Sequence, residues 1–172
     1  MQNIKIQAIT LQEGKTKIQF HFEEQRQGIT QIITANKTFK FGLHDDFQEA
    51  IDALKAHFVL LTEMVQTQKG QNLEEVSEMP VLEEFSVKQI KFTDKGTIKG
   101  VTITAQRTLE DGRVFKCPTP FANFDGETSD YKFIAELSND CEVLKEEITQ
   151  YINGKFSVEG TQLSMGDMTV AA

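Results

Sequence analysis

The 172-residue sequence predicts an α+β protein of two tandem β-β-β-β-α units, whose antiparallel sheets form a pseudo-twofold intramolecular dimer. Apolar residues step by three and four from Phe47 to Val65 and again from Ile134 to Ile152, which lines one face of a helix in each stretch. Each stretch follows alternating apolar and polar residues, which are typical of strands. The expected parts are a first unit at 1–66, an acidic linker at 67–84, a second unit at 85–153 and a tail at 154–172.

The first unit begins with alternating sequence broken by glycine. In the second of its runs, Ile18 and Phe20 alternate with Lys17 and Gln19. Glycines in the intervening turns can adopt positive φ, and a further glycine ends the last run. Asp45 or Asp46 is expected to cap the helix that follows. The predicted strands are 4–11, 16–24, 29–35 and 37–41.

The second unit repeats this order of elements. Aligning Ile9 with Ile90 gives an offset of 81 residues through the first hairpin, and the helical stripes align at an offset of 83. The shared order favours an internal duplication. Residues 113–117 match the third strand, and 121–124 match an irregular fourth strand beside two prolines. In the tail, Phe156 and Val158 alternate, so this segment is expected to be either an edge strand or a loose end.

The charge is segregated along the chain, although the net charge is -8. Residues 1–43 and 85–120, which are strand-like, carry +3 and +4, whereas residues 44–84 and 121–172 carry -8 and -7. Local charge of this kind matters more to a ligand than the net charge. No run reaches the ~18 apolar residues that a membrane span needs. The N-terminus lacks a secretory pattern and two dissimilar cysteines predict no disulfide, so a cytoplasmic location is expected.

Candidate catalytic residues are few. The three histidines have no metal-ligand spacing, and His44 lies at a helix entry. Cys141 replaces an aliphatic residue in the second helical stripe, which favours core packing. No phosphate-binding loop, dinucleotide glycine pattern or nucleophile elbow is present. The sequence therefore predicts a protein that is not an enzyme and that holds no cofactor and no metal.

The remaining signal is a set of cations and phenylalanines on the predicted strands and turns. Such a surface can follow a phosphodiester backbone and stack bases. Lysines on the solvent face of a sheet also serve solubility and edge protection, and both interpretations stay open. The candidate nucleic-acid-binding residues are Lys15, Lys17, Lys37, Phe39, Lys40, Lys88, Lys95, Lys99, Arg107, Arg113, Phe115 and Lys116.

Part of the second unit resembles a known group of proteins. Lys95-Gly96, then 101–105, then 112–116 and a helix at 131–152 are similar to the hairpin, the glycine–basic–aromatic strand and the long helix of PUR-type, whirly and positive-cofactor-type single-stranded nucleic-acid-binding proteins. The resemblance implies four strands and one helix in each unit, with exposed sheets that bind single-stranded DNA or RNA. The first unit lacks the glycine–basic–aromatic element, so the second is expected to bind more strongly, through Arg113 and Lys116. The alternative is a protein–protein adaptor or a viral or mobile-element assembly subunit, and homo-oligomerisation stays open.

Overall fold

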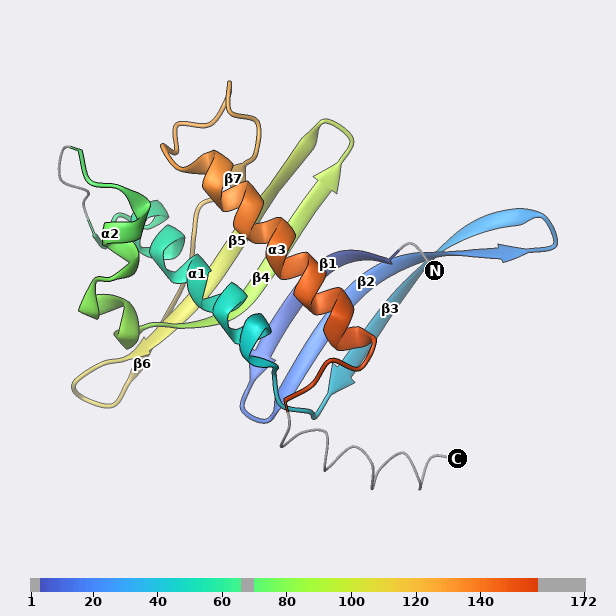
Figure 1. Cartoon of the computed structure of the whole chain (residues 1–172), viewed down its shortest axis with the longest axis horizontal. Coiled ribbons are helices and arrows are strands. Elements are labelled where there is room, and N and C mark those ends of the chain that lie inside the picture. The colour runs from blue at the N-terminus through green and yellow to red at the C-terminus, as the bar shows by residue number, and fades with distance from the viewer. Residues whose placement is uncertain (1–3, 66–69, 158–172) are drawn as a thin grey trace.

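The computed structural model describes residues 4–65 and 70–157. Within them the chain forms an α+β fold with one seven-stranded antiparallel sheet, ordered β3-β2-β1-β4-β5-β6, with β7 also beside β5 (Figure 1). The strands are β1 (Ile4–Gln12), β2 (Lys15–Arg26), β3 (Ile29–Phe39), β4 (Ser86–Lys95), β5 (Ile98–Thr108), β6 (Val114–Pro118) and β7 (Ala122–Asn123). The helices are α1 (Asp45–Leu61), α2 (Leu73–Ser77), the 3₁₀ helix η1 (Pro80–Glu84) and α3 (Ile134–Ile152).

The two long helices, α1 and α3, cross the same face of the sheet and contact each other (Figure 1). The second predicted stripe is confirmed and the first is confirmed as far as Phe58: Leu54 and Phe58 of α1 and Leu137 and Leu144 of α3 are completely buried. The first helix ends at Leu61, so the prediction that it reaches Val65 is wrong. α1 packs on β4 and β5, whereas α3 packs on β1. Each long helix therefore covers strands from the other half of the chain, and one continuous hydrophobic core joins both halves.

The halves of the sheet meet where β1 pairs with β4. The central pair is Ile9 with Ile90, both fully buried, and one further pair lies on each side. Each strand also has an irregular register with its hairpin partner: β1 between Ile6 and Ala8, and β4 between Val87 and Gln89. These irregularities are 81 residues apart, which is also the offset between Ile9 and Ile90.

That offset does not continue through the second strand of each hairpin. Ile9 pairs with Ile18, whereas Ile90 pairs with Ile103. The second hairpin is therefore two residues longer in each strand, and the offset grows from 81 to 85. The prediction of one ungapped offset through the whole first hairpin is therefore wrong beyond its first strand. The second hairpin is extended at its turn, while the pairing at the Ile9–Ile90 end is unchanged.

The prediction of four strands in the first unit is also wrong. The predicted strands 29–35 and 37–41 are parts of one strand, β3, because nothing near Asn36 interrupts the ladder with β2. In the second half, β6 and β7 both pair with β5, so they are two pieces of one edge. The interruption contains Pro120, which has no N–H to donate to a ladder. The sheet thus has three strand positions in each half.

The segment expected to be a linker contains two short helices. In α2, Asn72 and Glu75 form a capping box, with the Glu75 N–H donating to Asn72 Oδ1 at 2.8 Å. Val76 in α2 and Leu82 in η1 are buried and belong to the core. Four of the segment's five glutamates therefore lie on helices that pack against the domain, and the fifth, Glu78, is the C-cap of α2. Residues 66–69 lie outside the described part of the chain.

The cap of α1 and the end of the described chain also differ from the sequence prediction. The N-cap of α1 is His44, whose Nδ1 accepts a hydrogen bond from the Asp46 N–H at 3.2 Å, so neither aspartate is the cap. Near the C-terminus, Phe156 forms one antiparallel bridge with Leu43, while Val158 lies outside the described residues. In the described ranges, no helix is long and apolar enough to cross a membrane.

Candidate nucleic-acid interface

The face of the sheet opposite α1 and α3 is called the open face here; no described helix covers it (Figure 1). Successive side chains of a strand point to opposite faces, so the buried core residues assign each position to one face. In β2, for example, Ile18 and Phe20 face the helices, which places Lys17 and Gln19 on the open face. The open face is rich in threonine, glutamine, asparagine and lysine, and poor in acidic residues.

A shallow groove of about 220 Å³ runs over β1 to β4 on this face. Lys17 and Lys91 lie on its lining, both exposed. Between them the Gln89 Nε2–H donates to Thr10 Oγ1 at 3.3 Å. Cations, hydroxyls and amides are the groups that bind phosphate oxygens. The other polar side chains of the groove are Gln19, Asn36 and Thr38.

The two sides of the molecule carry opposite charge. α1 holds four acidic residues and one lysine, and α3 holds five acidic residues and one lysine. The alternation places a single carboxylate, Glu23, on the open-face positions of the described strands. The lysines that the alternation places on that face are Lys5, which forms an ion pair with Asp94 at 2.7 Å, and Lys15, Lys17, Lys91, Lys95 and Lys116. The charge segregation seen along the sequence thus becomes segregation between the two faces of the sheet.

Other predicted residues lie on the helix-covered side. Lys37 lies 5.8 Å from the centre of the Phe20 ring, and Phe39 packs edge-on against Tyr151 at 5.1 Å. Lys99 and Arg107 alternate with the buried residues of β5, and Phe115 pairs with Arg107, so these three also face this side. Arg107 forms an ion pair with Glu84 at 3.0 Å. The structure therefore does not bring the predicted phenylalanines together with the lysines of the open face.

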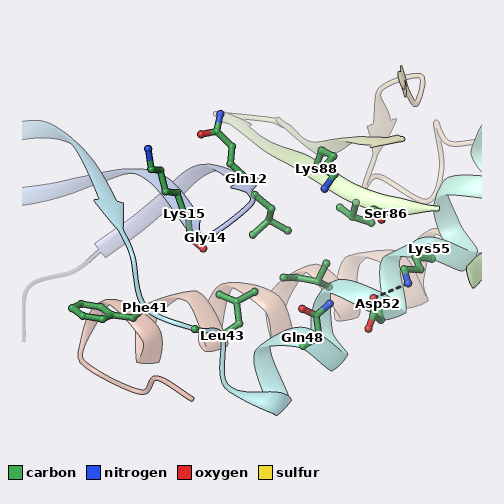
Figure 2. A pocket seen from close by; sticks show the side chains of 15 residues that line it. Gln12, Gly14, Lys15, Phe41, Leu43, Gln48, Asp52, Lys55, Ser86 and Lys88 are labelled. Atoms are coloured by element: carbon green, nitrogen blue, oxygen red, sulfur yellow. Dashed lines mark ion pairs between the residues drawn. The ribbon is translucent and has the colours of Figure 1, made fainter. Parts of the chain in front are cut away.

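The alternation of strand residues does not assign the last three predicted residues, Lys40, Lys88 and Arg113, to either face of the sheet. Arg113 is held in the β5–β6 turn by an ion pair with Asp111 at 2.6 Å, and Lys40 is exposed just after β3. Lys88 lies at the irregularity of β4 and lines a groove of about 360 Å³ between α1 and the sheet. Figure 2 shows the Lys88 ammonium pointing into that groove and Lys15 pointing away from it. The same groove holds the ion pair between Lys55 and Asp52, at 3.0 Å.

Lys5, Lys91 and Phe121 of the open face were not among the predicted residues. Lys91 could have been found, because it alternates with the apolar residues Ile90 and Phe92. Phe121 could not, because the short stretch between β6 and β7 gives no periodic signal. Its ring is 44% exposed and lies over Gly100, where an added Cβ would come within 2.5 Å of the ring. Phe121 is an aromatic surface at the margin of the open face.

A buried polar network joins α1, α3 and the segment before α3. His57 is completely buried, with Nδ1 2.7 Å from Tyr131 Oη and Nε2 3.0 Å from Asp140 Oδ2. An ionised carboxylate only accepts, so Nε2 donates to Asp140, and Nδ1 shares a hydrogen bond with the Tyr131 hydroxyl. Burial raises the pKa of Tyr131, which keeps this hydroxyl protonated. Because His57 is completely buried, it is not accessible to a substrate. Its two hydrogen bonds instead connect α1 with α3 and with the segment before α3.

The remaining chemistry-bearing residues form no further site. Among the residues that the structure describes, no three His, Cys, Asp or Glu side chains group as metal ligands. Burial raises the pKa of the Cys141 thiol to about 12, so it stays protonated and packs in the core. Comparison with known proteins found no matching family model, no matching curated protein and no matching solved structure.

Proposed function

We propose that the protein binds single-stranded DNA or RNA along the open face, with little sequence preference and without catalysing a reaction. The observation that carries the proposal is the difference in charge between the two faces: the open-face positions carry lysines and one carboxylate, whereas α1 and α3 carry nine carboxylates and two lysines. A polyanion would approach the open face and be repelled by the other. Lys17 and Lys91, which share the shallow groove, are its central phosphate contacts.

The chemistry of the groove favours backbone contacts over base recognition. Lysine binds phosphate as a point charge, and the hydroxyl and amide groups of Thr10, Gln19 and Asn36 can donate to phosphate oxygens. Phe121 offers a surface on which a base can stack, at the margin of the face. Because Phe39 and Phe115 face the other side, stacking contributes less than the sequence suggested, and electrostatic contacts dominate.

We also propose that the chain arose by duplication, with the two halves related by a pseudo-twofold axis through the Ile9–Ile90 pair. The symmetric pairing about these residues, the irregularities 81 residues apart and the exchanged packing of α1 and α3 support this. A relationship to the PUR-type, whirly and positive-cofactor-type proteins belongs to the same proposal. A long helix following antiparallel strands in each half supports it, whereas three strand positions in place of four count against it.

The absence of catalysis and a cytoplasmic location are parts of the proposal. His57 is sealed in the core, and Cys141 is protonated and buried, so neither offers a reactive group to a substrate. Cys117 and Cys141 are both free thiols, which suits a reducing compartment.

The test is a titration of a fluorescently labelled oligo-dT with the purified protein at several salt concentrations. Contacts with phosphates release counterions, so log affinity should fall linearly with log salt, with a slope of about 0.7 for each neutralised phosphate. An oligonucleotide of RNA should bind with a similar slope. No binding at low salt would refute the proposal and favour the protein–protein adaptor or assembly subunit.

A further inference from the structure

The two edges of the sheet are protected to very different degrees. The edge formed by β6 and β7 is short and broken, and it carries Lys116, Pro118 and Pro120. Lysine, proline and interruptions are the features by which proteins prevent a free edge from pairing with another strand. β3, at the other edge, is a continuous strand of 11 residues, and residues 27–36 contain neither a charge nor a proline.

The exposed apolar side chains of β3 also indicate that another strand binds at this edge. Ile29 and Ile32 are 63% and 73% exposed. The β2–β3 hairpin protrudes beyond the helical layer, so α1 and α3 do not cover its outer part (Figure 1). A two-stranded ribbon alone is marginally stable in water, and a third strand against β3 would pair its free backbone groups and cover these isoleucines.

The sequence of β3 is compatible with antiparallel pairing to itself. About a twofold axis at Ile32, this residue faces its own copy and Thr30 faces Thr34, all on the open face. On the other face Ile33 lies opposite Gln31, and Ile29 lies opposite Ala35. Such an arrangement places β-branched residues together and puts no like charges opposite each other. The protected edge at β6 prevents further addition, so pairing closes at two copies and forms no filament.

We propose that the outer edge of β3, which no described strand pairs, is a homodimer interface, at which two copies of this chain pair β3 with β3 antiparallel and join their sheets. The occupant is a second copy because residues 29–36 of the strand carry no charge and are complementary to themselves. The interface is separate from the phosphate-binding groove and needs no nucleic acid, so this proposal does not rest on the proposed function.

Sedimentation velocity of the full chain over a range of micromolar concentrations, without nucleic acid, tests the interface. The wild type should sediment as a concentration-dependent dimer. Ile32→Lys places two ammonium groups opposite each other and should raise the dimer Kd by about tenfold or more. Thr34→Lys, on the same face, should act similarly. Because both positions are exposed, circular dichroism should show folded proteins with melting temperatures close to that of the wild type.

The matched control is Val114→Lys, at a 58% exposed position on the opposite edge, β6. It should leave the dimer Kd unchanged. A wild type that stays monomeric throughout would overturn the proposal, and β3 would then await a strand from a different protein. A dimer that Ile32→Lys leaves intact, or that Val114→Lys weakens equally, would overturn it too, because the contact would lie elsewhere.

Discussion

The two faces of the single sheet have become opposite environments. One face carries isoleucine, valine and phenylalanine beneath α1 and α3, and these helices present carboxylates to solvent. The other carries lysine, threonine and glutamine, with Lys17 and Lys91 near its centre. The comparison shows that a net charge of -8 does not describe the two faces separately: the open-face positions of the strands carry lysines and a single carboxylate, whereas α1 and α3 carry nine carboxylates and two lysines.

The largest effect is expected where the covered face is made polar. Leu54→Asp or Leu137→Asp would bury an unpaired carboxylate in the shared core and should destabilise the protein by about 3–5 kcal/mol, enough to unfold it. Ala53→Asp, at an exposed position of α1, is the control and should have a small effect. Thermal unfolding followed by circular dichroism measures both. An unchanged melting temperature for either leucine variant would refute the assignment of the helix faces.

A smaller effect is expected at Gly100, where the open face lies under Phe121. A Cβ there would collide with the Ala122 carbonyl oxygen and with the Phe121 ring. Gly100→Ala should therefore cost about 2–3 kcal/mol, because β7 has to move away from β5. Gly126→Ala is the matched control, since a Cβ at that position meets nothing within 4 Å. Urea unfolding gives both values, and equal stability of the two variants would mean that Phe121 does not lie on Gly100.

The network beneath the helical layer should contribute less. Tyr131→Phe removes the hydroxyl that shares a hydrogen bond with His57 and leaves a buried ring nitrogen without its partner. A loss of about 1–2 kcal/mol in the free energy of unfolding is expected. Asp130→Asn, at an exposed neighbouring position, should change stability by less than about 0.5 kcal/mol. If Tyr131→Phe were as stable as the wild type, the network would not hold the helices together.

The sequence predicted the helices and the antiparallel strands well, because 3.6- and two-residue periodicities are local. The buried stripe from Phe47 to Phe58 followed from it. The pairing of Ile9 with Ile90 did not, because the sequence alignment marked them only as equivalent positions of the two halves. The merger of two predicted strands into β3 was missed because no local signal says whether a ladder continues past Asn36. The face on which Phe115 lies depends on its pairing with Arg107, which is a long-range property. His44 as a cap and the network at His57 likewise depend on tertiary contacts.

The candidate site was found only in part. Lys15, Lys17, Lys95 and Lys116 lie on the open face, so the alternation gave these correctly. Arg113 was expected to be a main contact, yet its ion pair with Asp111 holds it in a turn. The prediction that the second half binds more strongly than the first stays a prediction. The position of Lys91 beside Lys17, across β1, now makes the centre of the sheet the expected binding region.

The most direct test of the account compares the two faces in one binding assay. Lys17→Ala with Lys91→Ala removes two cations from the open face, and Lys99→Ala with Lys132→Ala removes two exposed cations from the helical side. Both double variants change the net charge equally. The open-face variant should weaken binding to labelled oligo-dT by about tenfold or more. It should also flatten the salt slope by about 1.4, at about 0.7 for each lost phosphate contact. The helical-side variant should bind like the wild type. Equal losses, or a greater loss from the helical side, would contradict the claim that the open face binds nucleic acid.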